Sequence, residues 1–462
     1  MSRIAKIVVF VLLFCIVFSI ACHIVSRKNA EEKYELFFDN PEDIDVLMFG
    51  SSHMLNGIIA MDLWNNYGIT SYNFGSHGCR IPTSYWMLKN ALDYASPKVV
   101  ILDCYMISAD LLIDPEDAYL HLAFDAFPLT KNKYQAIDEL LGESDNKLEF
   151  LFPFSSYHYR WSELTEGDFE KNISYERGTN IRIGLSEKNR EENLMETYSG
   201  DGVCIAYIEK AVQLFKERNI DIILTYLPTN DDAWTFEESN RVKNLAQSLD
   251  VDYIDRDTME DIVNYSCDFS DGDGHLNYSG AKAVTDYVGN YLINNYNLTD
   301  HREDPAYSHY FDEFSNYIDY EIKLISDQSN ASFMLPNLQS NDFGKVIYLG
   351  NFYGEGWLTY SPIRAMMSAW GITSQNYEEY SNRWVFFSGN EKVILNENVD
   401  FITENEDKIT ILSDENYQYL YFNDKLVVEI NKEDDIAIAV ALINNSQIPY
   451  AAKFNNLGSK VE

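Results

Sequence analysis

The stretch that decides the fold reads DVLMFGSSH, at residues 45–53. An apolar run typical of a strand, residues 46–49, ends abruptly at Gly50. Two serines follow, and then a stretch that can form a helix, residues 57–66. A serine at such a strand-to-helix turn projects from the backbone beside N–H groups that stabilise an anion. The pattern therefore indicates a nucleophile, although a serine in this position also serves as an ordinary helix N-cap.

A second polar stretch, DGDGHLN at residues 271–277, lies far downstream, just before another helical pattern. It supplies a base, His275, and two carboxylates, Asp271 and Asp273, either of which can orient an imidazole. Asp and Gly also build polar turns without any catalytic role. The order of the two stretches along the chain favours the hypothesis of a serine nucleophile with a histidine base.

Short apolar segments alternate with amphipathic segments through the first two thirds of the chain. The predicted strands are 46–49, 71–74, 99–102, 220–227 and 251–254, and the predicted helices are 82–94, 203–218, 236–249 and 279–293. This alternation predicts an α/β domain with a parallel sheet covered by helices on both faces. Ligands bind such sheets beyond the carboxyl ends of the strands, which is where the serine turn falls.

Together these motifs resemble the SGNH (GDSL-type) hydrolase superfamily over roughly residues 42–295. Gly50-Ser51-Ser52 is similar to its Gly-Asp-Ser block, with Ser in place of Asp, which places the nucleophile at Ser52. This Gly-Ser-Ser variant is similar to membrane-anchored envelope acyl-transfer proteins. Residues 73–78 resemble the second block, whose last glycine, here Gly78, donates an N–H to the oxyanion hole beside that of Ser52. The resemblance implies a three-layer, flavodoxin-like fold.

Two departures from the family pattern affect the expected site. The third block should contain an Asn that donates to the oxyanion, but this chain reads Asp-Cys-Tyr at 103–105. Tyr105 stands in that place, and its hydroxyl can donate instead. One such donor is worth roughly 3–4 kcal/mol in the transition state, so its loss would argue against efficient hydrolysis. The last block is one residue too long, which favours Asp271 as the triad acid and leaves Asp273 open.

Composition excludes several classes of function. The chain has 462 residues, enough for about three units of 150 residues, and its net charge is −38. Such a charge argues against nucleic acid as a partner, because binding to it depends on phosphate neutralisation by Lys and Arg. The six cysteines lack Cys-x-x-Cys spacing, and His53, His77 and His158 lack metal-ligand spacing. Neither a cofactor nor a metal is expected.

The N-terminus carries a membrane signal. Residues 7–25 contain no charged side chain, and nineteen helical residues span about 28 Å, close to the thickness of a hydrocarbon core. Basic residues flank the segment on both sides, so charge does not set its orientation. No small-x-small cleavage site follows it. We expect an uncleaved single-pass anchor at 1–29 in a bacterial cell membrane, a polar linker at 29–43, and an extracytoplasmic C-terminal bulk.

The predicted main domain, 30–300, contains a long irregular stretch at 106–200 that is expected to form a cap or insertion. Arg160 and Trp161 in this stretch, together with His53, are candidate substrate-binding residues, although ion-pair and packing roles are common for Arg and Trp. Residues 305–462 are expected to form a smaller accessory domain, α/β or β-rich. Its predicted elements are strands at 409–412, 417–422, 426–430 and 436–443, a turn at 423–424, and a helix at 357–370.

The resulting hypothesis is a membrane-anchored SGNH-like serine esterase or O-acyltransferase. The resemblance implies acyl esters of a cell-envelope glycan (a polysaccharide) or an acylated small molecule as substrate, and an acyl-donor membrane protein as partner in the case of transfer. The alternative is a non-catalytic anchored glycan-binding or scaffold protein with a relic triad. The two hypotheses differ in whether Ser52 and His275 must lie within hydrogen-bond distance.

Overall fold

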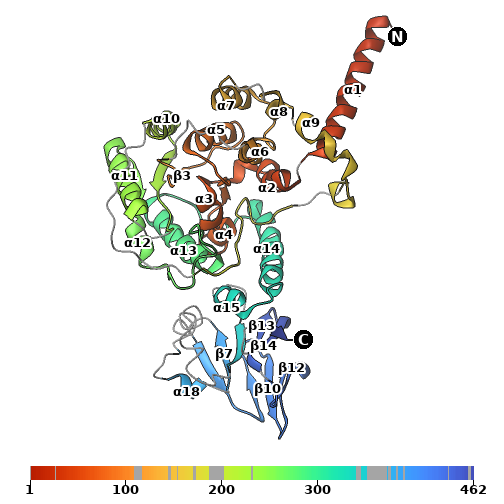
Figure 1. Ribbon diagram of the computed structural model, residues 1–462, viewed down its shortest axis with the longest axis vertical. Coiled ribbons are helices and arrows are strands. Elements are labelled where there is room, and N and C mark those ends of the chain that lie inside the picture. The colour runs from red at the N-terminus through yellow and green to blue at the C-terminus, as the bar shows by residue number, and fades with distance from the viewer. Residues whose placement is uncertain are drawn as a thin grey trace.

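The computed structural model describes residues 2–26, 28–108, 117–143, 147–152, 154–169, 173–186, 202–229, 233–339, 345–350, 372, 376–380, 383–388, 391–434, 436–455 and 459–461. The chain begins with helix α1 (Arg3–Val25), which projects from the body of the protein (Figure 1). Within the described residues, α1 is the one helix that is long and apolar enough to cross a membrane.

A five-stranded parallel sheet forms the centre of the larger part. Its strands are β1 (Val46–Phe49), β2 (Ser71–Asn73), β3 (Val99–Asp103), β4 (Asp221–Thr225) and β5 (Asp252–Ile254), in the order β2-β1-β3-β4-β5. Every neighbouring pair is parallel. Side chains of β1 alternate between two buried clusters, Val46 and Met48 on one face and Leu47 and Phe49 on the other. Burial on both faces explains the uninterrupted apolar run and confirms the predicted α/β class.

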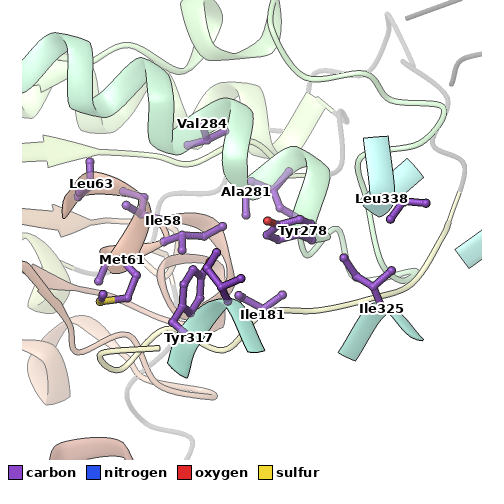
Figure 2. Packing of buried hydrophobic residues seen from close by; sticks show 14 of the residues in the cluster. Ile58, Met61, Leu63, Ile181, Tyr278, Ala281, Val284, Tyr317, Ile325 and Leu338 are labelled. Carbon is purple, nitrogen blue, oxygen red and sulfur yellow. The ribbon is translucent and has the colours of Figure 1, made fainter. Parts of the chain in front are cut away.

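Helices cover both faces of this sheet and give it three layers. One face is covered by α3 (Ser52–Gly57), α4 (Ala60–Tyr67) and α13 (Tyr278–Asn295), and α14 (His309–Ser326) and α15 (Ala331–Gln339) pack against these helices. The other is covered by α2 (Lys28–Asp39), α5 (Ile81–Ala91), α10 (Val203–Arg218) and α11 (Ala233–Leu249). In Figure 2, Ile58 and Val284 represent the first layer, and the same cluster continues through Tyr317, Ile325 and Leu338.

The predicted linker at 29–43 is wrong, because most of it is helix α2, followed by the short 3-10 helix η1 (Pro41–Asp43). Tyr34, Leu36 and Phe37 are buried in the second cluster. The helix is acidic and polar on its outer side, and these charges obscured the apolar face in the sequence.

Residues 106–200 were expected to be irregular, yet the described parts are largely helical. They form α6 (Asp117–Phe124), α7 (Lys131–Leu141), α8 (Lys147–Leu151), α9 (Phe154–Tyr157), η2 (His158–Ser162) and η3 (Glu166–Phe169). Most of these helices are too short to show a clear apolar period in the sequence. Residues of α6 and α7 join the cluster over the second face of the sheet, so this part of the insertion is a continuation of the helical layer.

Two antiparallel sheets form the C-terminal region (Figure 1). The first has the order β15-β14-β13-β6-β7-β8, from β6 (Lys345–Gly350), β7 (Trp384–Ser388), β8 (Glu391–Leu395), β13 (Ile436–Asn444), β14 (Gln447–Asn455) and β15 (Lys460–Val461). The second has the order β12-β11-β10-β9, from β9 (Val399–Ile402), β10 (Lys408–Ser413), β11 (Tyr417–Phe422) and β12 (Lys425–Asn431).

The turn between β11 and β12 was predicted from Asn423-Asp424, and the structure has it there. Both residues adopt positive φ angles, 48° and 62°, as a two-residue hairpin of type I′ requires. The helix predicted at 357–370 lies outside the described residues. The remaining short elements are α12 (Arg256–Glu260), η4 (Pro305–Tyr307) and α18 (Tyr377–Tyr380).

Candidate active site

The turn after β1 presents Ser52. Gly50 has a φ of 158°, and a Cβ there would lie 2.8 Å from the Cβ of Asp103, so the turn accommodates only glycine. Ser51 is the N-cap of α3, where its hydroxyl accepts the backbone N–H of His53 at 3.3 Å. Ser52 is the first residue of the helix and is only half-buried. Ser51 therefore has a structural role as the N-cap, whereas the hydroxyl of Ser52 is not used to cap the helix.

A hydrogen-bonded chain connects Ser52, His275 and Asp271. The Oγ of Ser52 lies 2.8 Å from Nε2 of His275, and Nδ1 of His275 lies 2.9 Å from Oδ2 of Asp271. The backbone N–H of His275 also donates to Asp271, at 3.3 Å. Asp273 is exposed, and its backbone N–H donates to Asp271 at 3.1 Å. Of the two carboxylates left open by the sequence, Asp271 is therefore the one against the imidazole.

Arg182 completes this arrangement, although no motif in the sequence singles it out. Its guanidinium forms an ion pair with Oδ2 of Asp271, and its own carbonyl accepts the N–H of Tyr278 at 2.9 Å. Partial burial works to raise the pKa of the Asp271 carboxyl. The charge and hydrogen bonds of His275, followed by the charge of Arg182, outweigh burial and lower this pKa below its ordinary value. Asp271 is thus held as a carboxylate.

His53 lies between two rings and is only 4% exposed. Its ring centroid is 3.7 Å from that of Tyr105 on one side and 4.8 Å from that of His275 on the other. Burial, assisted by the charge of His275, holds the pKa of His53 well below its usual range, so the ring is neutral. His53 packs against the imidazole of His275, and little of its side chain is left for a substrate to contact.

Gly78, the predicted oxyanion donor, is placed by a tight contact with α6. It has a φ of 58°, and a Cβ at this position would collide with the ring of Tyr119. Tyr105 lies close to the site through its contact with His53. The donor roles assigned to the N–H groups of Ser52 and Gly78 and to the Tyr105 hydroxyl remain predictions, because they concern a transition state.

The loop after β2 is fastened to the serine turn. The N–H of Ser76 donates to the carbonyl of Gly50 at 3.1 Å, and the side chain of Asn73 accepts the N–H of Gly75 at 2.8 Å. The Nζ of Lys33, from α2, donates to the carbonyl of Gly75. These bonds tie the segment that carries Gly78 to the nucleophile turn and hold it in one conformation.

A buried carboxyl lies under the same turn. Asp103, at the end of β3, accepts the backbone N–H of Leu227 at 3.1 Å, and burial raises its pKa to about 7. Asp103 stands two residues before Tyr105, and no motif in the sequence marks it as functional.

A cavity of about 370 Å³ adjoins the site at His77. Its polar lining includes Lys33, Glu176 and Tyr320. Burial lowers the pKa of Lys33 to about 7 and raises the pKa of Glu176 to about 7. The sequence identified neither residue, because they come from α2 and from the segment 173–186, far from every recognised motif. The cavity offers hydrogen-bond donors and acceptors to a polar ligand.

The structure places Arg160 and Trp161 in η2, beside the end of α1, and their substrate-binding role remains a prediction. The Arg160 guanidinium donates to the carbonyls of Val25, at 2.9 Å, and Ser26, and it pairs with Asp168 at 2.5 Å. Trp161 is exposed beside it. Arg160 therefore caps the C-terminal end of α1, where unpaired helix carbonyls favour a cation.

One group of side chains in the described part of the chain has the spacing to hold a metal ion, namely Asp271, Asp273 and His275, with ligand atoms within 4.8 Å of one another. Two of these three are already bonded to each other, and they also contact Arg182 and Ser52. A neighbouring guanidinium repels a cation, so this donor set suits a proton relay better than a metal.

No protein-family model and no curated protein matches the sequence. Among solved structures, the chain is similar to a "putative acylhydrolase" from Bacteroides fragilis, with 13% identity over 58% of this chain and 99% of that chain and a TM-score of 0.30. It is also similar to a GDSL-like lipase from Bacteroides thetaiotaomicron, with 10% identity over 57% and 97% and a TM-score of 0.29. At these TM-scores, nothing about the activity of this chain follows from the likeness.

Proposed function

We propose that the protein is a serine esterase or O-acyltransferase, anchored in the cell membrane by α1, that acts on acyl esters of a cell-envelope glycan. The observation that supports this proposal is the chain of contacts from Ser52 through His275 to Asp271. His275 Nε2 takes the proton from Ser52 Oγ as the hydroxyl attacks the ester carbonyl. Asp271 keeps the imidazole in the tautomer that makes this transfer productive.

The reaction proceeds in two steps. The first forms an ester between the acyl group and Ser52, and the alcohol leaves with the proton that His275 carried. In the second, His275 removes a proton from water, giving hydrolysis, or from an acceptor hydroxyl, giving transfer. The N–H groups of Ser52 and Gly78, with the hydroxyl of Tyr105, stabilise the oxyanion in both steps. Transfer would require an acyl donor, for which a second membrane protein is the candidate.

The cavity beside His77 supports a glycan as the substrate. Its ammonium, carboxylate and phenol groups, from Lys33, Glu176 and Tyr320, are suited to the hydroxyls of a sugar. Lys33 already donates to the carbonyl of Gly75, and Glu176 already accepts the N–H of Ile181. An apolar acyl chain would offer these groups no further hydrogen bonds and would remove their remaining contact with water, which costs free energy. The glycan ring would occupy the cavity, and its acyl ester would reach Ser52.

A serine-directed fluorophosphonate probe tests the proposal on the full-length protein. We expect covalent labelling of the wild type and turnover of small acyl esters, and complete loss of both in Ser52→Ala. Ser51→Ala is the matched control. It should retain labelling and lose about 1 kcal/mol of stability with its N-cap.

Absence of labelling in the wild type, or unchanged labelling in Ser52→Ala, would refute the enzymatic proposal. An anchored glycan-binding protein with a relic triad would then be the better account.

A further inference from the structure

Four exposed aromatic side chains lie in and next to the elements that pack against the C-terminal end of α1. They belong to the segment 147–169 and are Phe152, Tyr159, Trp161 and Phe169, here called the aromatic collar. Trp161 is 73% exposed and Phe169 is 65% exposed. Large aromatic side chains exposed together in this way mark a surface that meets an apolar partner.

Contacts along α1 fix the position of the collar. The elements α9, η2 and η3 all contact α1, and Figure 1 shows α9 beside its lower end. The ring of Phe154 lies 5.2 Å from that of Phe18, while Arg160 holds the carbonyls of Val25 and Ser26. Phe18 precedes Val25 by seven residues, which is about 10 Å along a helix. The segment therefore flanks roughly the last 10 Å of α1.

This position corresponds to the boundary of a bilayer. The 23 residues of α1 span about 34 Å, slightly more than a hydrocarbon core of about 30 Å. The end of α1 at Val25 must then lie at the level of the lipid headgroups. Phe154, which packs on Phe18 about 10 Å further along the helix, would reach from this level into the outer part of the hydrocarbon. Tyr and Trp are the side chains that favour this level, because each combines an apolar ring with a polar atom.

The charges of the segment agree with this location. Asp168 is the buried acidic residue of the segment 147–169, and it forms an ion pair with Arg160. Glu163 and Glu166 are exposed and can remain in water. With these acids beside it, the collar fits a zwitterionic lipid surface better than an anionic one.

We propose that the aromatic collar is a second membrane contact, inserted in the headgroup region of the bilayer that α1 crosses. The inference relies on the anchoring role proposed above for α1. It means that the domain carrying Ser52 rests on the membrane in a fixed orientation. The connection from α1 to α2 is short, with Ser26 and residue 27 between them, and leaves little chain for a swinging tether.

Spin-label accessibility in lipid nanodiscs tests this inference on the full-length protein. Cys15 and Cys22 are replaced by alanine, and single labels are placed at Trp161→Cys or Phe169→Cys in discs of phosphatidylcholine. Phe236→Cys on α11, exposed by 48%, is the water-facing control, and Leu12→Cys in α1 is the lipid-facing control. We expect labels at 161 and 169 to show a higher oxygen-to-nickel collision ratio than the label at 236.

The two proposals fail in different ways. A ratio at 161 and 169 equal to that at 236, with Leu12 in lipid, overturns the collar contact and retains the anchor; the collar would then face a protein partner or water. A water-accessible label at Leu12 overturns the anchor and the collar contact together. Phosphatidylcholine is the only lipid in the discs, and contact with protein would lower the access of oxygen as well as of nickel. A raised oxygen-to-nickel collision ratio at 161 and 169 therefore identifies lipid as the occupant.

Discussion

Two regions of this protein contain the same kinds of side chain, and only one connects them into a chain that begins at a serine hydroxyl. At the carboxyl end of β1, a histidine, an aspartate and an arginine converge on Ser52. In the segment 147–169, an arginine and an aspartate eight residues apart pair locally and hold the end of α1. The first group joins side chains separated by 223 positions, whereas the two side chains that pair in the second are eight positions apart. Among the residues that the structure describes, the long-range bonds of Arg160 go only to backbone carbonyls, at Val25 and Ser26. Long-range convergence of functional side chains therefore distinguishes the site, and local density of polar and aromatic residues does not.

The largest expected effect separates the two carboxylates near His275. Asp271→Asn should lower kcat on the order of 10⁴-fold, because an amide favours the wrong tautomer of the imidazole. Asp273→Asn is the matched control and should stay within about twofold of the wild type, since its side chain is exposed. Steady-state kinetics on a small acyl ester measure both. Equal losses in the two variants would contradict the assignment of Asp271.

A smaller effect is expected at Arg182. Arg182→Met should lower kcat roughly tenfold, equivalent to about 1.4 kcal/mol, because Asp271 loses a charged partner and is oriented less firmly. KM for a small ester should change little, since Arg182 is not placed to touch it. A loss confined to KM would indicate that Arg182 binds substrate instead.

The same variant has a pH signature. In the wild type, the pKa of Asp271 is lower in the folded state than in the unfolded state, where it is about 3.9. This difference stabilises the folded protein at pH values above about 3.9, and the contribution is lost as the pH falls through the pKa of the folded state. Arg182→Met raises the folded pKa again. The stability difference between the two proteins, measured by urea unfolding, should therefore be largest near neutral pH and narrow below about pH 4. A difference independent of pH would show that the ion pair does not perturb Asp271.

The smallest catalytic effect is expected in the other region. Arg160→Met should leave kcat within about twofold of the wild type, because its contacts are with the end of α1 and with Asp168. The thermal midpoint of the protein in lipid should nevertheless fall, since the carbonyls of Val25 and Ser26 lose their donor. A large loss of esterase activity in this variant would indicate that Arg160 binds substrate. The contrast drawn above between the two regions would then be wrong.

Much of the fold could be read from the sequence because its signals were local and periodic. The apolar run of β1 and the helical spacing in α10 each identify an element without any knowledge of its neighbours. The assignment of α2 failed because charged residues are interspersed with the apolar ones on a helix that buries one face. The residues of the candidate site also fall into a group that local motifs identify and a group that they do not. Ser52 and His275 stand in recognisable motifs, but Arg182 and Glu176 gain their positions only through tertiary contacts that no local pattern encodes.

Helix α2 has a practical consequence for anyone preparing a soluble version of this protein. Removing the apolar N-terminal helix is the usual first step, and a cut near residue 40 would follow the acidic stretch that looks dispensable. That cut would also remove Tyr34 and Phe37, which are fully buried, and Lys33, which holds the loop beside the nucleophile. Truncation should therefore stop before Lys28, because the first helix of the folded body begins there.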